Sequence, residues 1–198
     1  MKTMLKFLTA SFLASAIVLW IAPHYENQLR GESSLYPKAY SNTVKRAIAK
    51  SIRWADDEQI LRLVKRAEKR YGSDISRISR KYYACPKDIK AIAIVESSID
   101  EKAKSSEGAI GLMGVKRTTA KAMGFQDIEH PLNNLHAGTK YYTTLLKRFK
   151  DRELALAAYN LGPTGVGNRL SNGFDPETIQ YIWKIRRVIY VIDKSASS

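Results

Sequence analysis

A glutamate that directly follows an apolar run is the first candidate for chemistry in this sequence. Residues 91–95 read AIAIV, and Glu96 comes next. Ile92 lies one helical turn before Glu96, so helical phasing keeps this position in the core. Burial raises the pKa of a carboxyl group and lets it hold a proton near neutral pH, as a general acid requires. The alternative is a glutamate at a frayed helix end that faces water.

The segment after Glu96 has the composition of a groove for a polar ligand. Serines recur between residues 97 and 106, and the run GAIGLM follows at residues 108–113. Glycine lets the backbone approach a ligand closely. Hydroxyl groups and an acid beside a tight chain path suit a sugar polymer better than an apolar ligand.

Helices are the elements that must position this acid and the loop behind it. Apolar residues recur at three- and four-residue spacing, and no run shows sustained strand alternation. Start and stop signals predict helices over residues 41–52, 57–72, 73–78, 86–96, 118–123, 131–149, 152–161 and 176–192. The predicted fold class is therefore all-α, in one globular domain.

The N-terminal residues have the pattern of a membrane or export segment. Lys2 and Lys6 precede an uncharged stretch from Phe7 to Tyr25, which approaches the roughly 20 residues that a spanning helix needs. Basic residues on that side predict a single-pass inner-membrane anchor with the domain in the periplasm. The alternative is a cleaved signal peptide and a secreted or periplasmic product, because residues 14–16 read ASA.

The charge of the chain narrows its possible partners. The formal net charge is +14 over 198 residues, which indicates an anionic partner. An exported domain is not expected to meet nucleic acid, so anionic lipid or an anionic wall polymer remains. The predicted order is a signal-anchor or signal peptide over residues 1–25, a linker over 26–41, a basic helical segment packed on the domain over 42–74, and the main domain over 75–198.

Four ordered motifs give the sequence a specific family resemblance. They are Glu96-Ser97 with Ala103, Ser105 and GAIGLM, then NLHAGTKY at 134–141, ALAAYNLGP at 155–163 and ETIQY at 177–181. Over about residues 75–192 this order resembles the catalytic domain of lytic transglycosylases of the soluble-enzyme (SLT) type. The resemblance implies a lysozyme-like helical fold of the goose-type/SLT class, behind the N-terminal anchor or signal segment.

The same resemblance implies roles for individual residues. Glu96 would be the single catalytic acid and base. The implied supporting and substrate-binding residues are Ser97 beside the acid, Ser105 and Met113 in the groove, Tyr159 and Asn160 facing Glu96, and Tyr181 on the last helix. Core packing is the alternative for Met113, and a structural hydrogen bond is the expected role of Asn134.

The implied reaction cuts peptidoglycan glycan strands between N-acetylmuramic acid and N-acetylglucosamine. With one carboxyl group, the substrate's own 2-acetamido group and 6-hydroxyl would complete the chemistry and yield a 1,6-anhydro product. No cofactor and no metal are expected.

Two departures from the family pattern leave alternatives open. Gly114 stands where the family usually has glutamine, which would remove a polar substrate contact, and Arg117 stands where it usually has proline. One alternative is a goose-type-lysozyme-like muramidase that recruits water. The other is a weakly active peptidoglycan-binding module that serves the assembly of envelope-spanning machinery.

Overall fold

The computed structural model describes residues 54–169 and 174–196, and the predicted leader and linker lie outside this part of the chain. Its elements in order are α3 (Asp57–Tyr82), α4 (Pro86–Ser97), β1 (Ala109–Ile110), β2 (Val115–Lys116), α5 (Arg117–Ala122), α6 (Pro131–Phe149), α7 (Arg152–Leu161), α8 (Pro163–Arg169) and α9 (Pro176–Ala196). The mostly helical fold is as predicted. Within these described ranges, no helix has both the length and the hydropathy needed to cross a bilayer.

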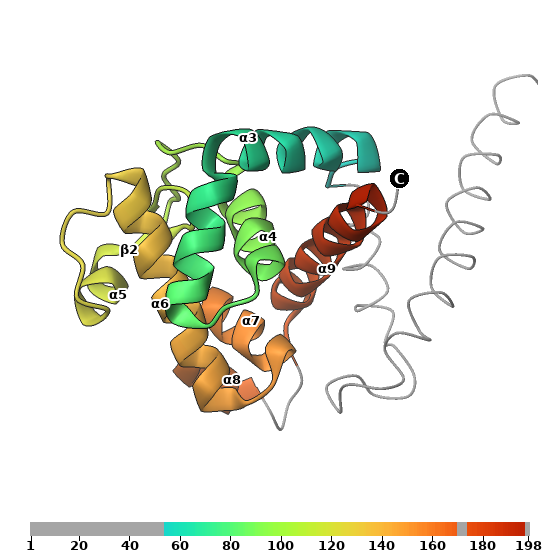
Figure 1. Ribbon diagram of the computed structural model, residues 1–198. Helices are drawn as coiled ribbons and strands as arrows, with labels where there is room; N and C mark the ends of the chain where they lie inside the picture. Colours follow the sequence, from blue (N-terminus) through green and yellow to red (C-terminus); the bar gives the residue numbers. More distant parts are fainter. Residues whose placement is uncertain (1–53, 170–173, 197–198) are drawn as a thin grey trace, which may run out of the picture. The chain divides into compact units, whose positions relative to one another are not determined.

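Helix α4 is the central element of the domain. Figure 1 shows it in green, below the first part of α3 and beside the red α9, and it packs against both helices. Its residues Ala91, Ile92, Ala93 and Ile94 are at most 1% exposed. A helix that is apolar on all sides is stable only when other elements enclose it. The AIAIV run therefore places the residues that follow it at a position set by the core.

Helix α3 differs from its prediction. Gly72 was expected to end one helix and Ser73 to begin another, but α3 continues through both residues. The predicted start is confirmed, because Asp56 caps the helix in a reciprocal capping box with Gln59. Figure 1 shows that α3 bends part-way along its length, and Gly-Ser pairs are common sites of helix kinks. The predicted boundary at Gly72-Ser73 is therefore wrong.

Two small elements were missed. Strands β1 and β2 form an antiparallel pair, with Ala109 opposite Lys116 and Ile110 opposite Val115. Two residues per strand are too few to produce a detectable alternation, so the all-α prediction was wrong on this point. Helix α8 was missed because Gly162-Pro163 was interpreted as a stop, although proline is also favoured in the first turn of a helix.

The start of α4 is fixed by an ion pair whose carboxylate is buried. Asp88 is 5% exposed. Its Oδ1 lies 2.7 Å from Nη2 of Arg152, and its Oδ2 accepts a hydrogen bond of 2.9 Å from the Tyr142 hydroxyl. These contacts tie α4 to α6 and α7. The apolar helix is thus anchored at the end opposite to Glu96.

Candidate active site

Glu96 lies in the last turn of α4, where its carboxyl group is partly buried. Its Oε1 accepts a hydrogen bond of 2.8 Å from the Tyr181 hydroxyl of α9. Burial raises the pKa of Glu96 to about 7, and this effect exceeds the lowering effects of Tyr181 and Lys184. A substantial fraction of Glu96 is therefore protonated near neutral pH. The alternative of a frayed helix end facing water is wrong.

Helix α9 supplies two residues to the surroundings of Glu96. Tyr181 is almost fully buried, and Lys184 follows three residues later on the same helix. The Lys184 charge acts on Glu96, and its ammonium lies 5.4 Å from the centre of the Trp54 ring. Sequence reasoning missed Lys184, although its spacing from Tyr181 places both on one helix face.

Gly114 lies directly against the Glu96 carboxyl group. Its φ is +57°, and a Cβ atom built at this position would lie 2.4 Å from Oε2 of Glu96. Any side chain at residue 114 must therefore displace the carboxyl group or the loop. The sequence suggested only that Gly114 removes a substrate contact, whereas the structure shows that it leaves the space in which Glu96 sits.

Met113 supports this loop from the core side. Its side chain is fully buried, and the Cβ that Gly138 lacks would lie 2.6 Å from its sulfur. Its backbone N–H donates to Oδ1 of Asn134 at 2.8 Å. The Met113 side chain is therefore packed against α6, and its groove-wall role stays a prediction. The structural role expected for Asn134 is confirmed, since its amide also donates to the carbonyl of Ile110.

Tyr159 and Asn160 lie at the end of α7. The Tyr159 hydroxyl donates to the carbonyl of Met113 at 2.8 Å, and its ring lies 5.3 Å from that of Tyr141. Burial first, and then the Glu96 charge, raise the pKa of Tyr159 well above its usual value. Tyr159 therefore lies near Glu96, but its hydroxyl group binds the backbone carbonyl of Met113. Asn160 is exposed, and its contact with substrate stays a prediction.

The two candidate serines have different positions. The Ser97 hydroxyl lies between two carbonyl acceptors, at 3.0 Å from that of Ala93 and 2.9 Å from that of Leu112. It therefore joins the end of α4 to the 111–114 loop, which is a supporting role. The exposed Ser105 accepts a hydrogen bond of 3.0 Å from the Ala109 N–H and closes the turn before β1. Its contact with a sugar stays a prediction.

The chain turns sharply after Glu96. Ser98 and Ile99 both have left-handed backbones, with φ of +53° and +63°, and this conformation is rare for a β-branched residue. Arg66 and Arg70 of α3 each donate to the turn at 3.4 Å, to the carbonyls of Ser98 and Ile99 respectively. Backbone strain of this kind persists only where surrounding contacts enforce it. Arg66 and Arg70 thus stabilise the turn that follows the C-terminal end of α4.

Other nearby carboxyl groups are engaged elsewhere. Glu101 accepts hydrogen bonds from Arg70 and Tyr71, and Glu107 pairs with Lys116 at 2.7 Å. Among the described residues, the influences on the pKa of Glu96 include no neighbouring carboxylate. The site therefore presents one carboxyl group, poised near neutrality, rather than a facing pair of acids.

Comparison with curated proteins finds relatives that share part of this chain. Membrane-bound lytic murein transglycosylase F of Pseudoalteromonas translucida (strain TAC 125) is 40% identical over 81 residues, which cover 37% of this chain and 17% of that protein. Membrane-bound lytic murein transglycosylase E of Buchnera aphidicola is 34% identical over 97 residues, which cover 43% of this chain and 44% of that protein. The chain thus spans less than half the length of either relative.

A solved structure and a family model cover more of the chain. Lytic transglycosylase Slt from Pseudomonas aeruginosa aligns with a TM-score of 0.58 at 20% identity, over 76% of this chain and 32% of that one. This likeness shows a shared fold. The family model described as Transglycosylase SLT domain matches residues 73–182, more than half of the chain. The chain therefore belongs to the transglycosylase SLT domain family.

Proposed function

We propose that this domain is a peptidoglycan lytic transglycosylase that uses Glu96 as its single acid and base. The observation that carries the proposal is the Glu96 carboxyl group, with a pKa of about 7 and a hydrogen bond from Tyr181. A group that must give and then take a proton works best when its pKa lies near the working pH. The names of the relatives, both lytic murein transglycosylases, support the same substrate class.

In the proposed first step, protonated Glu96 donates its proton to the glycosidic oxygen between N-acetylmuramic acid and N-acetylglucosamine. The bond from C1 of the muramoyl residue to that oxygen breaks, and the N-acetylglucosamine leaves with a neutral 4-hydroxyl. The muramoyl 2-acetamido group stabilises the positive charge that develops at C1. This substrate assistance replaces the second carboxylate that most glycosidases use.

In the proposed second step, Glu96 acts as a base. It takes the proton from the muramoyl 6-hydroxyl as that oxygen attacks C1, so the product is a 1,6-anhydro sugar and no water is consumed. Glu96 is then protonated again and ready for another cycle. The Tyr181 hydroxyl, which stays un-ionised because burial raises its pKa well above its usual value, stabilises the carboxylate between the steps.

The test is mass spectrometry of purified peptidoglycan after digestion by the full chain. We expect new 1,6-anhydro-muramoyl ends, and none with the Glu96→Gln protein. New reducing ends would show a muramidase that uses water. Binding without cleavage would show a peptidoglycan-binding module. Either result would contradict the proposed reaction.

We also propose that the enzyme works in the cell envelope, held at the periplasmic face of the inner membrane by residues 7–25. The support is the uncharged stretch after Lys2 and Lys6 and the word membrane-bound in the relatives' names. Intact-mass analysis of protein extracted from membranes tests this. A soluble product with an N-terminus near Ile17 would show signal cleavage instead.

A further inference from the structure

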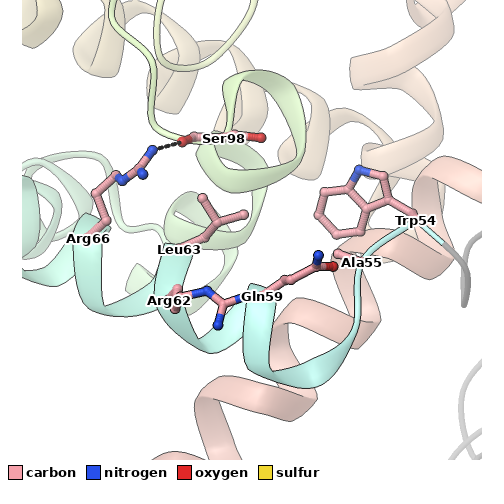
Figure 2. A pocket seen from close by; sticks show the side chains of 7 residues that line it. All are labelled: Trp54, Ala55, Gln59, Arg62, Leu63, Arg66 and Ser98. Atoms are coloured by element: carbon pink, nitrogen blue, oxygen red, sulfur yellow. Dashed lines mark hydrogen bonds between the residues drawn. The ribbon is translucent and has the colours of Figure 1, made fainter.

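A pocket of about 370 Å³ lies beside the end of α4. Its lining comes from the first part of α3, the residues just before it and the turn after Glu96; it consists of Trp54, Ala55, Gln59, Arg62, Leu63, Arg66 and Ser98. Figure 2 shows the indole of Trp54 at one side and Arg66 reaching the Ser98 carbonyl at the other. The pocket therefore combines an apolar wall with donor groups at its rim.

This pocket is connected to the acid in two ways. Ser98 forms part of its lining and follows Glu96 by two residues. Trp54 forms another part, and the Lys184 ammonium that contacts its ring also acts on the charge of Glu96. The pocket therefore shares the Ser98 turn and the neighbour Lys184 with the surroundings of the acid.

The charge of the pocket selects for an anion. Its described lining includes two guanidinium groups and no carboxylate. Arg62 shares its charge with Glu58 at 2.5 Å, whereas Arg66 donates to a backbone carbonyl, that of Ser98. Guanidinium groups bind carboxylates with paired, charge-assisted hydrogen bonds. Trp54 and Leu63 add apolar surface for the carbon chain that carries such a group.

We propose that this pocket is a subsite for the acidic stem peptide attached to a muramoyl residue of the glycan bound at Glu96. This inference rests on the proposed function, which places peptidoglycan at that site. The sugar rings of such a strand carry at most a lactyl carboxyl group close to the ring, which is an amide where a peptide is attached, whereas the stem peptides carry carboxylates on flexible carbon chains. All lining residues other than Ser98 precede the family match at residues 73–182.

The experiment compares peptide-bearing glycan with glycan from which an amidase has removed the peptides. The test variant is Arg62→Gln/Arg66→Gln in the full chain. We expect its kcat/KM on peptide-bearing glycan to fall roughly 5- to 10-fold, since partly exposed charge pairs are individually modest. Its kcat/KM on peptide-free glycan should fall less, by about twofold, because that substrate is affected only by loss of the Arg66 hydrogen bond to the turn after Glu96, whereas peptide-bearing glycan also loses the contacts to the peptide.

Two further variants separate a specific subsite from general attraction. Lys65→Gln removes an exposed charge from the same helix turn without touching the pocket, so it should leave the preference for peptide-bearing glycan intact. Arg66→Lys keeps the charge but loses the paired donors, so it should give an intermediate effect. Equal losses on both substrates, or an equal loss in Lys65→Gln, would overturn the proposal.

Binding measurements keep this proposal distinct from the proposed reaction. In the Glu96→Gln background, muropeptides and peptide-free glycan fragments are compared for affinity with and without the two arginine changes. If the arginine changes weaken binding of the muropeptide but not of the peptide-free fragment, the subsite is supported. That support holds even if the wild-type protein cleaves neither polymer, and in that case only the proposed reaction fails. Unchanged muropeptide binding would overturn the subsite.

Discussion

The two ends of α4 each carry a carboxyl group removed from water, but they serve different purposes. Asp88 near the start accepts from the Arg152 guanidinium and the Tyr142 hydroxyl. Glu96 near the end accepts from the neutral Tyr181 hydroxyl, and the Lys184 charge also acts on it. One helix therefore contains an ion pair that holds the fold and an acid that can exchange a proton.

The difference shows how the choice of partner decides the role of a buried acid. A guanidinium in direct contact compensates the loss of water around a carboxylate and keeps that group charged. A neutral hydroxyl compensates it only in part, so burial dominates and the pKa rises to about 7 at Glu96. The same change, carboxylate to amide, should therefore have opposite consequences at the two ends.

The largest expected effect is the loss of activity in Glu96→Gln. Glutamine has about the same size and still accepts from Tyr181, but it cannot deliver a proton. Acid–base help contributes about 10²–10⁴-fold, and one carboxyl group that serves both steps should put the loss at the upper end or beyond. Release of 1,6-anhydro muropeptides from purified sacculi measures it.

The control for this change is Glu107→Gln, which alters an exposed acid paired with Lys116. It should keep most activity. Thermal melting of both variants should show folded protein. Near-normal release by a folded Glu96→Gln protein would refute the assignment of the acid, and an equal loss in Glu107→Gln would indicate a second catalytic carboxylate.

At the other end of α4, Asp88→Asn should reduce stability rather than chemistry. Removing one partner of a buried pair leaves Arg152 uncompensated, and the partial exposure of Arg152 moderates the cost to about 2–4 kcal/mol. Urea unfolding measures the loss. Glu129→Gln is the matched control because its pair with Arg117 is exposed on both sides, so it should change stability by under about 1 kcal/mol. Equal effects would mean that burial of the pair is unimportant.

The pH dependence of stability sharpens the comparison. The folded-state pKa of Glu96 is raised from 4.5 to about 7. The contribution of protonated Glu96 to the free energy of unfolding is therefore complete below pH 4.5 and is lost as the pH rises through 7. Above pH 7, Glu96→Gln should therefore be more stable than the wild-type protein, by on the order of 2–3 kcal/mol. Near pH 4.5 the two proteins should melt alike. A constant difference across this range would contradict the raised pKa.

A smaller effect is expected from Gly114→Ala, which tests how the Glu96 carboxyl group is placed. The added Cβ would displace that group, because its flexible end yields more easily than backbone, and a small misplacement can cost up to about 10²-fold in rate. We expect kcat to fall about 10-fold or more with little change in KM.

Gly124→Ala is the control for Gly114→Ala. Its φ of +84° imposes a similar backbone strain, but nothing lies within 4 Å of the added atom. Both variants should lose similar stability, and only Gly114→Ala should lose activity. Equal activity in the two would show that Gly114 does not position the acid.

Several features were predictable from the sequence because they depend on local chemistry. The start of α6 follows from Pro131 and the end of α7 from Gly162-Pro163. The candidacy of Glu96 followed from a carboxyl group placed at the end of AIAIV. The break predicted at Gly72 was wrong, because α3 continues through this residue. The β1–β2 sheet was missed, because two-residue strands produce no detectable alternation.

The tertiary structure decided what surrounds the acid. Periodicity places Tyr181 and Lys184 on one face of α9, but only packing of α9 against α4 brings that face to Glu96. The pattern GLMG did not reveal that Gly114 leaves room for a carboxyl group 18 residues earlier in the chain. A pKa depends on desolvation and on charges brought together from distant segments. The sequence by itself therefore identified Glu96 as the candidate acid, and the fold determined the pH range in which its carboxyl group holds a proton.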